Sequence, residues 1–482
     1  MILLVLLITP LVAALVLAFI GDRRFAPELN ILSSVLTLAA GAVLAIEVCN
    51  HGPVITGGKF FYVDAFSVFL SVLTSFVSVT TAVFSRRYME REREHGRVGH
   101  RRMRFYHAMF QMFIFAMLLC LLTNNIGVLW IAMELATLST VLLVSLYRSP
   151  GAIEAAWKYF ILCGVGIAQA LFGTVLLYFA AEKVLGEGGE ALLWTNLIGV
   201  SGKLEPTVLS LAFVFLVVGY GTKVGLVPLH NWLPDAHSEG PTPISAVLSG
   251  LLLNIALYAL VRCKVLVDGS THTHYAGNIM MGFGIVSILV ASFSILRQRD
   301  IKRMFSYSSI EHMGIATFAF GLGGSIATFG ALLHMLMHSL TKSSIFFITG
   351  NACQMHRTQE IAKIKGLFNG DSFVGWTLML SSMAIAGMPP FGIFTSEFLI
   401  LTATIKEAPL LAPFILIGLA VAFAGLLRKV QYMVAGDVPS YYTPMKTART
   451  PVLLHMTLVL ALGFYLPDFL NKWFQSAVEL LK

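Results

Sequence analysis

Lys223 is the residue whose presence is hardest to explain by packing alone. It follows an apolar run, Thr207 to Tyr220, and lies in GYGTKVGLVPLHNWLPDAHSEGPTP at 219–243. An ammonium group at the centre of a bilayer costs about 2.5 to 3.5 kcal/mol unless it faces a partner or a water-filled cavity. We therefore expect Lys223 to hold and pass on a proton, with an acidic group nearby.

Three carboxylates within apolar runs are candidate partners for buried lysines. Glu134 lies in NNIGVLWIAMELATLSTVLLV, Glu311 in SYSSIEHMG and Glu397 in AIAGMPPFGIFTSEFLIL. A buried carboxylate alone protonates and a buried lysine alone becomes neutral, whereas a pair of the two keeps its charges. Such a pair passes on a proton when the pairing is disturbed, and Glu134 is the best placed partner for Lys223.

A line of imidazoles follows in the second half of the chain. HMLMHSLTK places His334, His338 and Lys342 at intervals of four, along one helical face. Groups that titrate near neutral pH in such a line suit a proton relay. The spacing also suits a metal ion, but no cysteine or carboxylate lies nearby in the sequence to complete a site, so no metal is expected. Lys158 can reach the interface by snorkelling and is a secondary candidate.

The composition of the whole chain is that of a membrane protein. Its 482 residues are 57% hydrophobic and 12% charged, with a mean hydropathy of +0.80, whereas soluble domains are about 25% charged. Apolar runs long enough to cross a bilayer recur throughout. They predict about fourteen transmembrane helices, near 2–20, 29–48, 65–85, 105–122, 125–147, 151–181, 207–229, 241–266, 277–296, 303–322, 325–350, 372–405, 411–434 and 451–470. The first is interpreted as a retained helix because it lacks a basic n-region and a cleavage site.

The distribution of Lys and Arg predicts the orientation. Loops after the odd-numbered helices hold most of these residues, above all between Arg86 and Arg104, and such loops stay in the cytoplasm. Both termini are therefore expected to face outward, and the net charge of +8 requires no nucleic acid. This assignment places Arg262 in an outward loop and Lys302 in a cytoplasmic loop. It leaves three lysines within helices, namely Lys158, Lys223 and Lys342.

Two predicted helices carry backbone breaks beside the ionisable residues. Helix 7 has a Gly-Tyr-Gly run and Pro228 around Lys223, and helix 12 has GMPPFG at 387–392 before Glu397. Backbone groups freed by Gly and Pro are tolerated at membrane depth only inside protein or beside a wet cavity. Two breaks at matching places predict two inverted repeats, helices 4–8 and 9–13, with the ion path between them.

No redox or nucleotide site is expected on this chain. Its five cysteines are scattered without a C-x-x-C pair, so neither an iron-sulfur cluster nor a disulfide framework is indicated. A Walker A motif and a dinucleotide fingerprint are both absent from the sequence. The energy for ion movement must therefore come from an ion gradient or from another subunit.

The motifs together resemble a known family. KVGLVPLHNWLPDAHSEGPTP at 223–243 resembles the broken seventh helix of the proton-conducting membrane subunits of respiratory complex I, Mrp antiporters and energy-converting hydrogenases. The likeness extends through Glu134, RDIKRMFSYSSIEHMG at 299–314, HMLMHSLTK and GMPPFGIFTSEF. Within this family, residues 154–180 and the charged loop 86–104 look most like the hydrogenase-4 component F group, of the formate hydrogenlyase type.

This resemblance implies an all-α polytopic membrane fold of about fourteen helices with two inverted five-helix repeats. The implied regions are helices 1–3 with a basic cytoplasmic loop (1–104), a first repeat (105–266), a second repeat (277–434) and a last helix (435–482). Glu134 and Lys223 are then the charge pair of the first half. The remaining implied relay residues are His334, His338, Lys342 and Glu397, with Lys158, Asn254 and His312 as secondary members.

Asn254 departs from the family pattern, because members commonly carry a lysine at that position of helix 8. An amide can hold a water wire but cannot take up a charge, which puts a charged central site in doubt. Cofactors are implied only on partner chains, as a nickel-iron centre, iron-sulfur clusters or quinone. The implied partners are other antiporter-like and small membrane subunits and a hydrophilic redox arm.

The sequence leaves three functions open. The first is a proton-translocating subunit of a multi-subunit redox complex in the inner membrane of a prokaryote. The second is a subunit of an Mrp-type antiporter that exchanges sodium for protons without redox chemistry. The third is a membrane scaffold that no longer pumps, an interpretation that Asn254 supports. The subunit composition of the purified complex distinguishes the first from the second.

Overall fold

Apolar runs separated by short polar or glycine-containing connections produce the long helices of the computed structural model, which describes residues 1–481. The first four are α1 (Ile2–Ile20), α2 (Ala26–His51), α3 (Ala65–Glu94) and α4 (His100–Leu122). The antiparallel strands β1 (Val54–Thr56) and β2 (Phe61–Val63) connect α2 to α3. Asp64 begins α3 with a reciprocal capping box, in which its carboxylate accepts from the backbone N–H of Ser67 at 2.9 Å.

The middle of the chain carries the first break. Its elements are α5 (Ile126–Val144), η1 (Ser145–Tyr147), α6 (Pro150–Leu185), η2 (Gly189–Leu192), α7 (Trp194–Val200), η3 (Ser201–Lys203), α8 (Pro206–Val224), α9 (Trp232–Glu239), α10 (Thr242–Val247), the π-helical turn η4 (Leu248–Leu252) and α11 (Leu253–Thr271). Small residues allow α6 and α8 to pack closely, since a Cβ added to Gly219 would lie 2.7 Å from the carbonyl oxygen of Gly166.

The last part of the chain repeats the pattern of long helices with one break. Its elements are α12 (Tyr275–Arg297), α13 (Ile301–Leu322), α14 (Gly324–His356), η5 (Ile361–Lys363), α15 (Leu367–Gly370), α16 (Ser372–Ile385), α17 (Gly392–Glu407), η6 (Pro409–Leu411), α18 (Ala412–Val434), α19 (Arg449–Phe464) and α20 (Asp468–Leu480). The break between α16 and α17 falls where the sequence predicted it.

Eleven helices among residues 1–481 are long and apolar enough to cross a membrane, and the bent pair α19 and α20, which turns by 81°, makes a twelfth. The all-α polytopic membrane architecture is thereby confirmed. The two further predicted spans correspond to α13 and to the shorter pair α16 and α17. Length and composition therefore do not establish the predicted count of fourteen.

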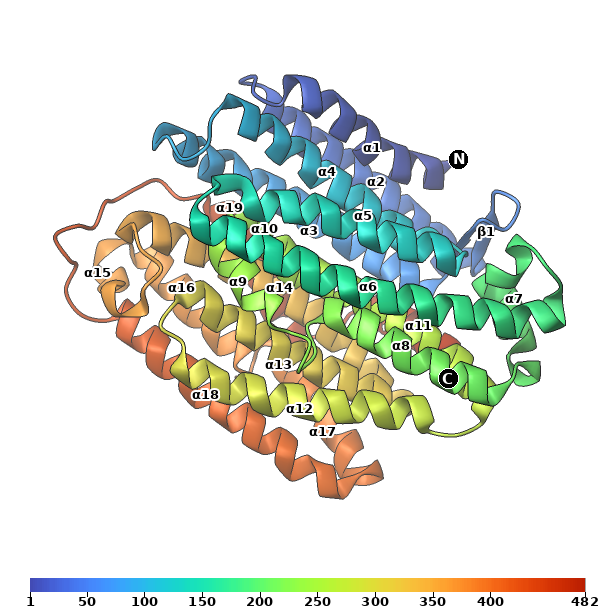
Figure 1. Cartoon of the computed structure of the whole chain (residues 1–482). Coiled ribbons are helices and arrows are strands. Elements are labelled where there is room, and N and C mark those ends of the chain that lie inside the picture. The colour runs from blue at the N-terminus through green and yellow to red at the C-terminus, as the bar shows by residue number, and fades with distance from the viewer. Residues whose placement is uncertain (482) are drawn as a thin grey trace.

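The bundle places its polar residues on its most buried elements. Figure 1 shows α1, α2 and α4 at one edge of the bundle, α12 and α18 at the other edge, and α14 between them. In the most apolar 18-residue stretch of each span, 100% of the residues are buried in α10 to α11 and 94% in α14, whereas only 39% are buried in α6 and in α12. The interior helices carry Asn254, His334, His338 and Lys342, so these side chains are enclosed by protein.

The loops and termini gather at two ends of the bundle. Both termini lie at the end that holds β1 and α7, whereas α15 and the connection 435–448 lie at the opposite end (Figure 1). The two termini are therefore on the same side, as expected from the sequence. Which side faces the cytoplasm stays a prediction.

The first break falls between the Gly-Tyr-Gly run and Pro228, where the sequence predicted it. Helix α8 ends at Val224 because Gly225 adopts a left-handed conformation with φ +82°, which breaks the span 207–229 as expected. The indole N–H of Trp232 donates to the carbonyl of Thr222 in the last turn of α8 at 2.8 Å, and the backbone N–H of Gly225 donates to the same oxygen at 3.2 Å. The predicted helix 241–266 is also interrupted, by η4, where a Cβ on Gly250 would lie 2.9 Å from Ser343 Oγ of α14.

Candidate functional site

Lys223 lies at the end of α8, immediately before the break, and its side chain is fully buried. Its ammonium donates to the hydroxyl oxygen of Thr137 on α5, and that hydroxyl donates to the carbonyl of Met133 at 3.0 Å. The ammonium also lies 5.7 Å from the ring centroid of Tyr159 on α6. Neutral groups from α5 and α6 therefore solvate this charge, whereas the sequence led us to expect an acidic partner.

Glu134 lies one turn before Thr137 on α5, close enough for its charge to interact with that of Lys223. No ion pair within 4.0 Å joins the two residues in residues 1–481, so the predicted charge pair is not a contact pair here. Glu134 is half-buried and shares its face of α5 with the exposed Ile131 and Leu138. The carboxylate therefore lies between the buried lysine and the outer surface of the bundle.

Lys342 repeats this arrangement in the second half. Its side chain is fully buried on α14, and its ammonium donates to the carbonyl oxygen of Phe305 on α13 at 2.8 Å. Glu311, also buried on α13, is the carboxylate whose charge interacts with it. As with Lys223, a neutral oxygen contacts the ammonium and a carboxylate lies farther away.

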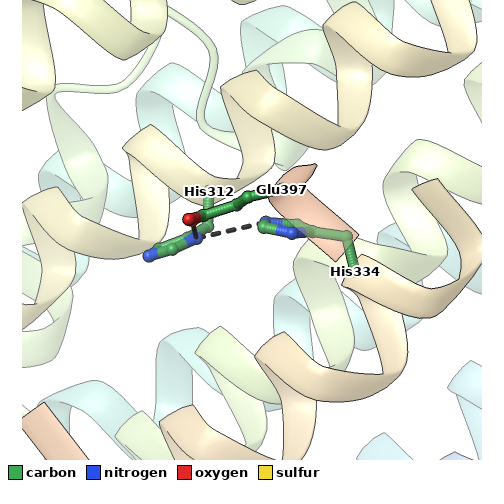
Figure 2. A group of neighbouring side chains, drawn as sticks. All are labelled: His312, His334 and Glu397. Atoms are coloured by element: carbon green, nitrogen blue, oxygen red, sulfur yellow. Dashed lines mark hydrogen bonds and ion pairs between the residues drawn. The ribbon is translucent and has the colours of Figure 1, made fainter. Parts of the chain in front are cut away.

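His312, His334 and Glu397 meet from three helices, α13, α14 and α17 (Figure 2). His312 Nδ1 lies 3.1 Å from His334 Nε2 and 3.9 Å from Glu397 Oε1. His334 Nδ1 lies 2.9 Å from Ser396 Oγ on α17. The sequence predicted a role for the first three residues but could not show that they meet, and it missed Ser396.

The hydroxyl of Ser396 fixes the direction of these hydrogen bonds. It donates to the carbonyl of Ile393 at 2.7 Å, so it accepts from His334 Nδ1–H. A neutral His334 with its proton on Nδ1 offers the lone pair of Nε2 to His312 Nδ1–H. The result is an ordered chain from His312 through His334 to Ser396, in which the two imidazoles can exchange a proton with each other.

His338 and Asn254 lie beside this chain. The His338 ring lies 5.7 Å from that of His312, and both of its nitrogens lack a hydrogen-bond partner among residues 1–481. Asn254 on α11 donates to Ser339 Oγ of α14 at 2.7 Å and to the carbonyl of Met335 at 3.2 Å. A neutral amide thus occupies the place where the resemblance implied a lysine.

The break between α16 and α17 makes room for Glu397. A Cβ on Gly387, which has φ +73°, would overlap Glu397 Oε2, and a Cβ on Gly392 would overlap the sulfur of Met337 on α14. The glycines of GMPPFG therefore bring α17 against α14. The close approach of α17 to α14 therefore explains why the GMPPFG motif lies just before Glu397 in the sequence.

Lys158 lies outside the buried relay. Its side chain is 47% exposed and forms ion pairs with Glu154 at 2.6 Å and Asp235 at 3.2 Å. The snorkelling interpretation fits this position, and we do not include the residue in the site.

The assignment of Arg262 and Lys302 to loops was wrong, because both lie in helices and are buried. Arg262 on α11 pairs with the equally buried Asp64 at 2.6 Å. Lys302 on α13 donates to the carbonyls of Ser238 and Gly240 at 2.7 and 2.8 Å, where α9 ends. Buried His237 on α9, which stacks on Phe346 at 4.8 Å, was also missed. Lys302 and His237 lie near helix ends, where hydropathy does not separate a buried charge from a loop, whereas Arg262 lies in the middle of α11.

The structure also changes the argument about metal ligands. The sequence offered no carboxylate near His334, but α17 brings Glu397 to it from another part of the chain. One potential ligand atom from each of His312, His334 and Glu397 lies within 4.8 Å of the others. The reason for expecting no metal therefore does not hold.

A family model described as the transmembrane part of NADH:quinone oxidoreductases and Mrp antiporters matches residues 123–423, more than half of the chain. The chain belongs to this family. A "Hydrogenase-4 component F homolog" of Methylacidiphilum infernorum is 47% identical over 98% of both chains. NADH-quinone oxidoreductase subunit M of Escherichia coli is 27% identical over 86% of this chain and 83% of its own.

Solved structures show that the family fold extends over nearly the whole chain. A chain of the membrane-bound sulfane sulfur reductase, an archaeal respiratory membrane complex, superposes with a TM-score of 0.90 at 22% identity and covers 100% of this chain and 98% of its own. A chain of the Mrp complex from a Dietzia species gives 0.85 at 18% identity, over 99% and 97%. The resemblance read from the sequence is thus confirmed at the family level.

Proposed function

We propose that this antiporter-like subunit moves protons through the membrane within a hydrogenase-4-type redox complex. The proposal rests on the buried titratable groups in the two halves, Lys223 in one and Lys342 and His334 in the other, with the largely buried Glu397 beside His334. Buried ionisable residues at membrane depth are costly and mark ion paths. The relative that is 47% identical over nearly its full length is a hydrogenase-4 component F homolog, which supports the hydrogenase-type assembly.

The mechanism follows from the contacts of the two lysines. The ammonium of each lysine contacts a neutral oxygen, while the carboxylate that interacts with it, Glu134 or Glu311, lies farther away. A small movement of that carboxylate therefore changes the electrostatic field at the ammonium without breaking a direct ion pair. Redox chemistry on a partner subunit would supply that movement. The proton that leaves Lys342 would enter the histidine line and reach Glu397.

Proton flux into sealed vesicles that contain the assembled complex tests the proposal. Lys223→Ala should reduce pumping to the rate of vesicles without the complex, because the mid-membrane proton carrier is gone. Lys223→Arg should not restore it, since a guanidinium keeps its proton at any accessible pH. The matched control is Lys406→Ala, whose parent side chain is 73% exposed near the end of α17. Pumping by Lys223→Ala at the wild-type rate would show that this lysine is structural.

Subunit composition separates the alternatives. Copurification with iron-sulfur or nickel-iron subunits supports the redox complex. An assembly of antiporter subunits alone, with flux that depends on sodium, would instead indicate an Mrp-type exchanger. If the wild-type complex assembles and is redox-active but moves no protons, the chain is a membrane scaffold, the alternative that Asn254 suggested.

A further inference from the structure

The cluster of His312, His334 and Glu397 can do more than pass protons. We propose that it binds a divalent transition-metal ion of the zinc class in competition with the transferable proton. The ion site follows from the geometry of the cluster, while its effect on pumping rests on the proposed function.

The spacing of the three ligand atoms fits one small ion. Zinc binds imidazole nitrogen at about 2.0 to 2.1 Å and carboxylate oxygen at about 2.0 to 2.2 Å, so neighbouring ligands of a tetrahedral site lie about 3.3 Å apart. The His312 to His334 separation of 3.1 Å is close to this value. The 3.9 Å from His312 to Glu397, and the 4.8 Å within which all three atoms lie, require the carboxylate to move toward the imidazoles. Glu397 Oε1 is buried and has no hydrogen-bond partner among residues 1–481.

Ser396 supplies the outer support that metal-binding histidines have in other proteins. A ligating imidazole usually donates its second N–H to an oxygen, which fixes its orientation and tautomer. His334 Nδ1–H donates to Ser396 Oγ in this way, and its Nε2 then faces His312 (Figure 2). The site is therefore oriented before an ion arrives.

Binding exchanges protons for the ion without any change of oxidation state. The lone pairs of His312 Nδ1, His334 Nε2 and a Glu397 oxygen form three bonds to the ion, and water takes the fourth position. The proton on His312 Nδ1 moves to Nε2 of the same ring, so that imidazole stays neutral. A protonated Glu397 releases its proton to solvent. Affinity should therefore increase with pH, because the ligands bind only without the proton.

The ligand set selects the class of ion. Two imidazoles and one carboxylate suit zinc, whereas magnesium and calcium prefer oxygen ligands. A bound ion occupies the lone pair through which His334 accepts from His312. The hydrogen-bond chain is then interrupted at its centre, so the ion should inhibit proton transfer through the second half.

Zinc counting on the purified full complex tests the site directly. The background is a His272→Gln, His274→Gln variant, because these two imidazoles lie in an exposed loop and would bind zinc nonspecifically. Each complex is incubated with zinc chloride and desalted, and its zinc content is measured by elemental mass spectrometry. The background variant should hold one zinc ion per complex more than the same variant with His334→Gln or Glu397→Gln added. His312→Gln tests the site from a third helix. Excess magnesium should not displace the ion.

The matched control is His455→Gln. His455 is as buried as His334, but its two nitrogens already bond to the carbonyl of Leu340 and to Thr80 Oγ1, at 2.9 and 2.8 Å. This variant should retain the zinc. Ser396→Ala should bind zinc about tenfold more weakly through loss of the outer support. Equal zinc in wild type, His334→Gln and Glu397→Gln would overturn the proposal.

The zinc count does not depend on transport, so failure of the ion site and failure of the proposed function are distinguishable. Micromolar zinc should also stop proton pumping in vesicles, and the effect should weaken as the pH falls. If the complex binds zinc but still pumps protons at the full rate, the ion does not inhibit transport and this cluster is not part of the relay.

Discussion

At the scale of single residues, neutral oxygens contact the buried ammonium groups of this protein. Lys223 meets a threonine hydroxyl, Lys342 a backbone carbonyl, and Lys302 two carbonyls at a helix end. Arg262 differs, because it forms a direct buried pair with Asp64. An isolated buried pair is expensive to disturb. A direct buried pair is what a purely structural charge requires, so we expect Arg262 to stabilise the fold, and the proposed function assigns the change of charge to Lys223 and Lys342.

Ser396→Ala tests the direction of the histidine hydrogen bonds. The variant removes the oxygen that accepts from His334 Nδ1–H, at a cost of about 1 kcal/mol for a lost hydrogen bond, and leaves the His334 tautomer unfixed. We expect proton flux in vesicles to fall several-fold while the complex still assembles. Ser396→Thr keeps the hydroxyl and should retain most of the flux. Equal loss in both variants would assign the effect to packing instead of the hydrogen bond.

At the scale of elements, helix breaks position the ionisable residues. α8 ends one residue after Lys223, and α17 begins five residues before Glu397. In both places glycine supplies a backbone conformation or a close approach that a side chain would prevent. The break between α16 and α17 is the more constrained of the two, because Glu397 packs directly against Gly387.

Gly387→Ala should move Glu397 away from His312. Its Cβ would overlap the carboxylate, and alanine at φ +73° adds backbone strain of about 1 kcal/mol or more. We expect strongly reduced proton flux in vesicles. Gly436→Ala is the matched control, because Gly436 also has positive φ, at +89°, but meets nothing within 4 Å. Equal flux in the two variants would show that backbone strain alone, without the contact to Glu397, accounts for any loss.

The sequence predicted these elements better than it predicted their contacts. Hydropathy located the helices, and Gly-Pro runs located the breaks near Lys223 and Glu397, because both depend on residues close together in the chain. The meeting of His312 with Glu397 depends on packing between α13 and α17, which no local pattern reveals. Lys302 was taken for a loop residue because charges near a helix end look alike whether protein or water surrounds them.

At the scale of the whole molecule, the exposed surface differs in kind from the interior. Large apolar side chains such as Trp157, Phe160 and Leu138 line the outside of α5 and α6 and enclose a groove of about 360 Å³. Such a surface fits lipid or the helices of neighbouring membrane subunits. The relatives of this chain belong to multi-subunit complexes, which is consistent with an outer surface of this kind.

The orientation of the molecule in the membrane is the prediction that sets the direction of proton movement. Arg86 to Arg104 should lie in the cytoplasm, because loops rich in Lys and Arg are retained there. Gly96 lies in that connection and Gly188 in the connection before α7. Both have positive φ and meet nothing within 4 Å, so a cysteine side chain has room at each. In a Cys49→Ser background, which removes the exposed native thiol, an impermeant thiol reagent added outside intact cells should label Gly188→Cys and leave Gly96→Cys unlabelled. Permeabilised cells should label both, which controls for reactivity. The opposite pattern would reverse the orientation and with it the proposed direction of proton movement.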